Sequence, residues 1–388
     1  MRILALMSSR GFYGAERANL HVLHLMVSCG VRVDAMVRHE PWPENLHLRD
    51  ELDKRGVSTH HAAFPDYPSM AYKRYWPRVM LQLPLRVLLL NTRFLQLMLS
   101  RRPDVVLLNG IFHAFCLFPA LLLTRLPSVY YVNSAPELHN AFYRLAWRWV
   151  SSRVSRFVCE SDFIARKLHA MGVPGERVTV IRSDAPHRVD CIPWVDESFR
   201  CRESGQIFCF IGQLTYNKGL GVLLDAFKIV HKNQPSARLV IAGRVSAFFN
   251  DLKKKYADDP FMKAVNFYGS VEDVHGLLMA STVHVAPSYS EEAYGLVVIE
   301  AKKSARPSIV FDSGGISELI DDRQDGYIIR QKTKNALAEV MMTYCRSPQL
   351  AIDHGLAAKA SLEWRLKTHE QPKRWLAAFK SVISKTSL

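Results

Sequence analysis

The chain of 388 residues has cysteines but no cysteine pattern. Its seven cysteines are scattered, without a Cys-x-x-Cys pair and without the Cys/His spacing of a zinc site. This argues against a metal site and against a framework of disulfides, and it is typical of a protein of the reducing cytosol. We therefore expect no bound metal.

The sequence also lacks a long, uninterrupted hydrophobic run. The first ten residues hold only a short apolar stretch, which is typical of a first strand rather than of a signal peptide, so secretion is not expected. Residues 105–124 are the most apolar segment, but they contain Asn109, Gly110 and Pro119. We expect a strand, a loop and a buried helix there instead of a membrane span.

Two segments in the first half of the chain have no acidic residue, and the net charge of the whole chain is +15. Residues 72–102 carry seven basic residues and no acid, and residues 141–156, which we expect to be helical, carry four more and again no acid. A basic segment with leucine and aromatic side chains favours contact with an anionic membrane, although helices of an α/β domain also bury a leucine stripe. Nucleic acid is not expected as a partner, because no helix-turn-helix, zinc finger or RNP-like pattern accompanies the charge.

Strands and helices alternate along the chain, which predicts parallel sheets, and the length suggests two domains. We place an N-terminal domain at residues 1–185 and a linker rich in proline and charge at 186–203. A C-terminal domain follows at 204–365. The last segment, 366–388, is expected to form a helix that crosses back to the first domain.

No G-x-G-x-x-G follows the first expected strand, residues 2–7. Glycines in the next loop can still let the backbone approach a ligand at the carboxyl edge of a parallel sheet, or can serve the turn alone. The strands expected before Asn109 and Asn133 each end in asparagine, where a ligand would approach. A lone histidine near such a strand end, such as His113, is more often structural than a ligand contact. The candidates for this N-terminal cleft loop are Gly11, Gly14, Ala15, Asn109, His113 and Asn133.

In the second half, Gly212 and Gly219 flank a loop that carries Lys218 just before an expected helix, residues 220–231. Such a loop can place one cation and aligned backbone N–H groups beside a diphosphate. The alternative is a lysine that is simply solvated.

Residues 283–300 read as a strand, a loop and a helix beginning at Tyr294. The N–H groups of residues 293–297 would then face an anionic ligand at the helix start. Glu292 lies at the mouth of the turn and Glu300 eight positions later, so both carboxylates could accept hydrogen bonds from sugar hydroxyls. Alternatively, Glu292 is an acid placed by the helix dipole and Glu300 is solvated.

Several segments, in order, resemble the retaining GT-B glycosyltransferases of the family 4 type, or glycosyl transferases group 1. They are the Gly-Gln-Leu to Asn-Lys-Gly loop, Val-Asn-Phe-Tyr-Gly-Ser-Val, Glu-Ala-Tyr-Gly-Leu-Val-Val-Ile-Glu, and the strand, Gly-Gly loop and Glu-bearing helix that follow. The resemblance implies an α/β GT-B fold, with two Rossmann-like domains whose parallel sheets face across a cleft. It implies retaining, metal-independent transfer of the hexosyltransferase type, with no cofactor beyond the nucleotide-diphosphate sugar as co-substrate.

The resemblance also implies roles for individual residues, with Lys218 and Glu292 catalytic. Two positions depart from the family pattern. Gln213 stands where an arginine usually joins the lysine, with Arg244 as a candidate substitute, and Asn133 stands where many members have histidine. The implied donor contacts are Gly212, Gln213, Lys218, Arg244, Gly269, Ser270, Val271, Glu292, Ala293, Tyr294, Gly295, Leu296, Val297 and Glu300.

These features together predict an enzyme that moves a sugar to a glycan or lipid-linked acceptor in bacterial surface polysaccharide synthesis, such as lipopolysaccharide or capsule. It would act in the cytoplasm, peripherally at the inner face of the plasma membrane. The alternatives are a nucleotide-sugar epimerase of the same fold and a catalytically degenerate basic binding protein.

Overall fold

The chain folds into two compact units, one made of residues 1–183 and 369–388 and the other of residues 184–368. The computed structural model describes residues 1–9, 14–39, 43–66, 76–134, 136, 141–184, 205–271 and 273–384, without the side chains of residues 43–47, 76 and 78. The predicted linker, residues 186–203, lies outside this range.

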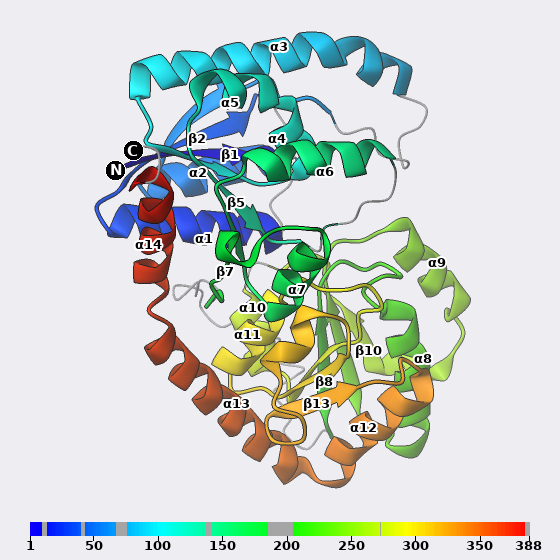
Figure 1. The fold of residues 1–388 in the computed structure, drawn as a ribbon. Coiled ribbons are helices and arrows are strands. Elements are labelled where there is room, and N and C mark those ends of the chain that lie inside the picture. The colour runs from blue at the N-terminus through cyan, green and yellow to red at the C-terminus, as the bar shows by residue number, and fades with distance from the viewer. Residues whose placement is uncertain are drawn as a thin grey trace. The chain divides into compact units, whose positions relative to one another are not determined.

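The first unit is a doubly wound parallel sheet with the strand order β3-β2-β1-β4-β5-β6-β7 (Figure 1). The strand order reverses direction between β1 and β4, where the carboxyl ends of doubly wound sheets bind ligands. Its described strands are β1 (Arg2–Met7), β2 (Arg32–Arg38), β3 (Ser58–Ala62), β4 (Val105–Leu108), β5 (Ser128–Val132), β6 (Arg156–Cys159) and β7 (Val178–Val180).

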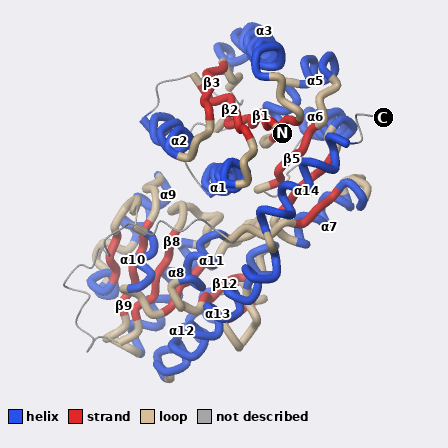
Figure 2. Tube along the Cα trace, turned by 90° about the vertical axis from the view of Figure 1, so that its left-hand side faces the viewer, coloured by secondary structure: helices blue, strands red, loops and turns tan. Residues whose placement is uncertain are grey.

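Helices cover both faces of this sheet, with α3 and α5 on one side and α1 on the other (Figures 1 and 2). The strands are therefore buried on both faces and read as continuous apolar runs. The described helices are α1 (Gly14–Ser28), α2 (Pro43–Lys54), α3 (Trp76–Arg101), α4 (Ile111–Cys116), α5 (Phe118–Thr124), α6 (Ala141–Arg153), α7 (Asp162–Ala170), the 3-10 helix η2 (Gly175–Arg177) and α14 (Gln371–Ile383).

Helix α14, close to the end of the chain, packs against α1 and the central strands of this first unit. Trp375 is almost completely buried, and its ring meets that of Tyr131 on β5 edge to face at 5.1 Å. His21 on α1 is hydrogen-bonded to Gln371, and Arg374 donates to the carbonyl oxygen of Val180 at 2.9 Å.

The second unit is also a parallel sheet, in the order β10-β9-β8-β11-β12-β13. Successive residues of β8 feed two cores on opposite faces: Phe208 and Phe210 pack with α8 and α12, whereas Ile207 and Cys209 pack with α10. The strands are β8 (Ile207–Ile211), β9 (Arg238–Ala242), β10 (Val265–Phe267), β11 (Val283–Ala286), β12 (Ser308–Phe311) and β13 (Gly326–Ile329). The helices are α8 (Leu220–Asn233), α9 (Ala247–Lys255), η4 (Pro260–Ala264), α10 (Val274–Met279), α11 (Leu296–Lys303), η5 (Gly315–Leu319), α12 (Lys334–Arg346) and α13 (Pro348–His369).

Two of the expected helix boundaries and one expected helix type are wrong. The helix expected from Tyr294 begins at Leu296, because Gly295 takes a left-handed conformation with φ 108°. The helix expected over residues 141–156 ends at Arg153, and Arg156 already begins β6. The helix expected after the Gly-Gly loop is the short 3-10 helix η5, which carries Glu318.

Candidate functional site

The loops after β8 and β9, at the carboxyl edge of the second sheet, contact each other through their backbones. The N–H of Gly212, after β8, donates to the carbonyl of Ala242 at 3.0 Å. Gly243, after β9, has φ 155°, and a Cβ there would lie 1.6 Å from the carbonyl oxygen of Gly212. Only glycine can occupy this position, and its missing side chain permits the close approach of the two loops.

The loop after β8 also meets a third loop, the one after β11, through Gly219, which precedes α8 and has φ 76°. A Cβ at Gly219 would lie 1.8 Å from the carbonyl oxygen of Pro287, in the loop after β11. The N–H of Tyr289 donates to the carbonyl of Asn217 at 2.8 Å, and the rings of Tyr216 and Tyr289 stack at 5.4 Å. The loop that carries Lys218 is thereby held against the loop that carries Glu292.

These loops bring Lys218 and Glu292 into an ion pair, with Nζ 2.5 Å from Oε1. The hydroxyl of Ser288 donates to the same Oε1 at 2.6 Å. Both charged side chains are partly exposed, at 31% for Lys218 and 17% for Glu292, so a ligand can reach them. The structure therefore unites, in one polar cluster, two residues that lie 74 positions apart in the sequence.

The backbone of Glu292 is anchored in the next loop of the sheet. Its N–H donates to the carbonyl of Ser313 at 2.8 Å, and its own carbonyl accepts from the N–H of Gly315 at 2.8 Å. The hydroxyl of Ser313 donates in turn to the carbonyl of Ser288. Glu292 thus lies in a braced loop and not in the first turn of α11, which excludes the alternative of an acid placed there by the helix dipole.

Gly295 sets the start of α11. A Cβ at this position would lie 2.8 Å from Cγ1 of Ile316, so glycine serves both the left-handed turn and the packing. Ala293 and Tyr294 are buried before it, so only their backbone is suited to meet a ligand. Glu300, four residues into the helix, is partly exposed.

The other candidates of this unit lie at the same edge. Gln213 and Arg244 are exposed and follow β8 and β9, and the N–H of Leu214 donates to the carbonyl of Arg244 at 3.3 Å. Gly269 and the exposed Ser270 follow β10, with φ 65° at Gly269. Because β10, β9, β8 and β11 are neighbours in the sheet, their carboxyl ends converge on one region.

The N-terminal candidates follow β1, β4 and β5, which are also neighbours. Asn133 donates from Nδ2 to the carbonyl of Ala15 at 3.2 Å, so the loops after β5 and β1 meet. Asn109 is buried, and Nε2 of His113 lies 3.0 Å from the carbonyl oxygen of Pro65. Gly14 begins α1, whereas Gly11 lies outside the described residues.

Sequence reasoning missed Ser288 and Ser313, which brace Glu292, and also Glu16. Glu16 lies in the first turn of α1, at the same edge as Ala15. Burial raises the pKa of Glu16 above its ordinary value, and a hydrogen bond with Ser9 partly opposes this. A carboxyl group with a raised pKa at the carboxyl edge of a sheet is a candidate for proton transfer. The Gly-Ala-Glu-Arg segment was its only signal in the sequence.

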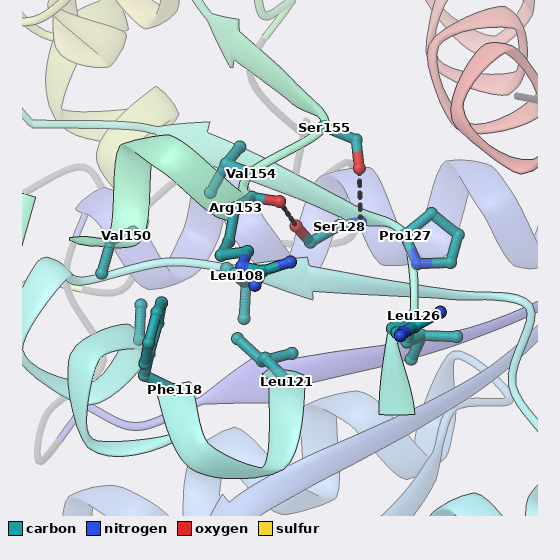
Figure 3. A pocket seen from close by; sticks show the side chains of 12 residues that line it. Leu108, Phe118, Leu121, Leu126, Pro127, Ser128, Val150, Arg153, Val154 and Ser155 are labelled. Atoms are coloured by element: carbon teal, nitrogen blue, oxygen red, sulfur yellow. Dashed lines mark hydrogen bonds between the residues drawn. The ribbon is translucent and has the colours of Figure 1, made fainter. Parts of the chain in front are cut away.

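A cavity of about 180 Å³ lies in the first unit, between α5, α6 and the sheet (Figure 3). Phe118, Leu121 and Val150 give it an apolar lining, and Arg125 and Arg153 add two cations. The Lys218–Glu292 pair lies in the second unit, so this cavity is not part of that cluster.

Two doubly wound units, one with a lysine, a glutamate and helix starts at its carboxyl edge, define an α/β protein suited to nucleotide ligands. The family comparison is more specific. Residues 196–360 match the family described as glycosyl transferases group 1, and residues 13–183 match the glycosyl transferase 4-like domain. The two matches span most of the chain, and the protein belongs to the group 1 glycosyltransferases.

Individual relatives match over part of their length. The chain is 26% identical over 251 residues to the lipopolysaccharide core biosynthesis mannosyltransferase LpcC of Rhizobium leguminosarum bv. viciae, covering 60% of this chain and 65% of LpcC. It is 28% identical over 185 residues to the amylovoran biosynthesis glycosyltransferase AmsD of Erwinia amylovora, covering 47% of this chain and 50% of AmsD. The matched part therefore spans between half and about two thirds of these relatives.

Solved structures resemble the chain over nearly all of it. The structure of Anabaena Alr3699/HepE in complex with UDP-glucose has a TM-score of 0.77 at 16% identity, covering 97% of this chain and 100% of that one. A glycosyltransferase from Rickettsia africae has a TM-score of 0.75 at 19% identity, covering 98% of both chains. These likenesses confirm the predicted GT-B fold class with two Rossmann-like units.

The helices also bear on membrane insertion. Within the described residues, none combines the length and the apolar content needed to cross a bilayer, and this includes α3 with its 26 residues.

Proposed function

We propose that this protein transfers a sugar from a nucleotide-diphosphate sugar to a glycan or lipid-linked acceptor, with retention of anomeric configuration and without a metal. The observation that carries the proposal is the Lys218–Glu292 pair, held at the carboxyl edge by backbone contacts that only glycine permits. Family membership supports the reaction class. The names of LpcC and AmsD support an acceptor in surface polysaccharide synthesis.

Lys218 is assigned to the leaving diphosphate. Its ammonium group has three N–H donors, so it can keep its bond to Glu292 while it donates to a phosphate oxygen. The starts of α8 and α11 lie on the flanking loops and add backbone N–H groups. Charge that develops on the diphosphate as the sugar departs would be neutralised by groups already in place, and many enzymes gain most of their rate enhancement in this way.

Glu292 is assigned to the hydroxyls of the transferred sugar. Lys218 and Ser288 both contact Oε1, and we assign Oε2 to the sugar. Its braced backbone keeps the carboxylate in one position, which is what orientation of a reacting ring requires. Glu300 would hold the ribose, and the backbone of residues 269–271 would border the base.

Arg244 is assigned as the second phosphate cation in place of the arginine that Gln213 replaces. The two residues lie on neighbouring loops, joined by the hydrogen bond between Leu214 and Arg244. Loss of Arg244 should therefore weaken donor binding more than loss of Gln213. Equal effects of Arg244→Ala and Gln213→Ala would remove this assignment.

The test of the main assignment is Lys218→Ala. Loss of one preorganised cation should cost about 2–4 kcal/mol of transition-state stabilisation, a roughly 30- to 1000-fold fall in kcat/KM. Lys228→Ala is the matched control, since Lys228 pairs with Asp259 on the same unit and should leave turnover within about twofold. Nucleotide release is measured over a panel of nucleotide sugars and acceptors, after a thermal-shift screen for the donor. Unchanged turnover in Lys218→Ala would reject the role.

Gln213 favours one second candidate, a degenerate transferase that binds nucleotide sugars without turning them over. Donor binding with no nucleotide release from any sugar and acceptor would establish it. Donor converted without acceptor would instead indicate epimerase chemistry. NMR of the product distinguishes retention from inversion at the transferred carbon.

The basic first half leads us to propose action in the cytoplasm at the inner face of the plasma membrane, through peripheral contact with anionic lipid. Such contact would bring the enzyme to a lipid-linked acceptor. Turnover on a lipid-linked acceptor that does not respond to anionic vesicles would count against it.

A further inference from the structure

The outward face of α3 is apolar. Leu81 is 82% exposed and Leu85 and Leu88 are each 59% exposed, at positions four and three residues apart that share one side of a helix. The opposite side is buried through Leu90 and Phe94. A surface helix normally turns polar residues outward, so a helix that is apolar on both sides needs a second apolar environment.

Helix α5 extends this surface. It packs against α3 on the same side of the sheet (Figure 1), and its Leu122 and Leu123 are exposed. Helix α6 adjoins α5, with the rings of Phe118 and Trp149 5.1 Å apart, and Trp149 is half exposed. We call the α3–α5 face the surface formed by Met80, Leu81, Leu85, Leu88, Leu89, Leu122 and Leu123.

The charged side chains of the helices at this face are all basic. The sequences of α3, α5 and α6 contain no acid. Arg86 is held beside Asp66 of the preceding segment, and Arg93 donates from Nε to the carbonyl of His61 at 3.1 Å. Further arginines stand at 101, 125, 144, 148 and 153. Exposed leucines bordered by arginine, with the half-exposed Trp149 on the adjoining helix α6, complement anionic lipid headgroups over an acyl interior.

We propose that the α3–α5 face docks on an anionic lipid bilayer, with α3 along the membrane surface and its exposed leucines in the interfacial layer. This inference names the surface for the peripheral contact and rests on that part of the proposed function. Its test needs neither donor nor acceptor. Failure of the docking surface therefore leaves sugar transfer standing, and failure of sugar transfer leaves the docking surface standing.

The experiment measures partition of the full-length protein onto vesicles of phosphatidylcholine alone and of phosphatidylcholine with phosphatidylglycerol in equal parts. The variant is Leu85→Glu with Leu88→Glu. The matched control is Ile352→Glu with Leu356→Glu on α13, whose side chains are 56% and 59% exposed. We expect the anionic vesicles to bind the native protein, the α3 variant to bind at least tenfold more weakly, and the control to bind within twofold. Part of the native binding should survive 0.5 M salt, because leucine insertion is not screened.

Four results would overturn the proposal. The first three are no binding of the native protein to anionic vesicles, equal binding by the α3 variant and the control, and complete loss of native binding at high salt. The fourth is a native dimer that the α3 variant converts to a monomer while vesicle binding is unchanged. The last result would assign the face to contact between two copies. Melting temperatures of both variants verify folding. A second variant, Leu123→Ser on α5, should weaken binding without introducing charge.

Discussion

Glu160 is the buried carboxyl group with the clearest consequence for stability. It follows β6, is 3% exposed, and accepts a hydrogen bond from the hydroxyl of Tyr131 at 2.6 Å. Desolvation raises the pKa of Glu160 to about 7, while the bond from Tyr131 and the neighbouring His21 oppose the rise. Between about pH 4.5 and 7 the native protein therefore holds a proton that the unfolded chain has released.

This predicts a fall in stability with rising pH. Between pH 4.5 and 7 the unfolded chain loses the proton of Glu160 and the native state keeps it, so the free energy of unfolding decreases through this window and is level above it. Glu160→Gln keeps the shape and removes the titration. From pH 5 to pH 7.5 the native protein should lose about 2 kcal/mol more than the variant, at 1.36 kcal/mol per pKa unit. Urea unfolding at the two pH values measures this, and parallel losses in both proteins would show that Glu160 is ionised when folded.

Gly219 allows a second test at the scale of one residue. Gly219→Ala adds a Cβ in a left-handed conformation, which costs about 1–2 kcal/mol, and places it 1.8 Å from the carbonyl oxygen of Pro287. The control is Gly172→Ala, where φ is 84° and the Cβ would meet nothing within 4 Å. Both variants should lose stability, but only Gly219→Ala should also lose the thermal shift produced by the donor. Equal effects would mean that the loops after β8 and β11 do not touch.

At the scale of elements, α14 completes a core that is otherwise built from residues 1–183. Trp375 is its largest fully buried side chain, between Tyr131 on β5 and Phe379. Trp375→Ala should cost about 3–5 kcal/mol, because it opens a large cavity. Trp375→Phe should cost clearly less than Trp375→Ala, because part of the ring packing remains and the cavity is smaller, and because the buried indole N–H has no hydrogen-bond partner in the described structure. Urea midpoints test both, and similar losses would show that ring packing does not hold α14.

The sequence predicted the helices and strands well, because the spacing of apolar residues differs between the two. It predicted where they begin and end less well. Continuous apolar runs located β8 and β11, and alternation with helices indicated parallel sheets. The end of α6 and the start of α11 depend on tertiary context. Gly295 takes its left-handed conformation where Ile316, from η5, packs against it. No local pattern carries that information.

The sequence predicted which residues form the candidate site, but not which other residues hold them in place. Lys218 and Glu292 were named from spacing and resemblance, and the structure brings them together. The bracing of Glu292 by Ser288 and Ser313 was not foreseen, because serines in loops are common and their partners lie in other loops. Whether these residues perform the roles assigned to them stays a prediction.

At the scale of the whole molecule, the donor candidates all belong to residues 184–368, which form one unit with its own core. A ligand that binds only the native form of this unit raises the free energy of unfolding of the unit by mass action. The increase is about 2.7 kcal/mol when the ligand concentration is one hundred times Kd. The other unit gains nothing directly. Ligand binding should therefore divide the chain into a protected and an unprotected part.

Hydrogen exchange with a saturating nucleotide sugar measures this division. Amides of β8, β9 and β11 should exchange roughly 100-fold more slowly with donor, since about 2.7 kcal/mol corresponds to that factor. Amides of β1, β4 and β5 should change little. The Lys218→Ala variant should lose most of the protection while its rates without donor match those of the native protein, because the partly exposed Lys218 supports the ligand more than the fold. Slowing confined to β1, β4 and β5 would move the nucleotide to the other unit, and equal slowing throughout would mean that the two units open as one.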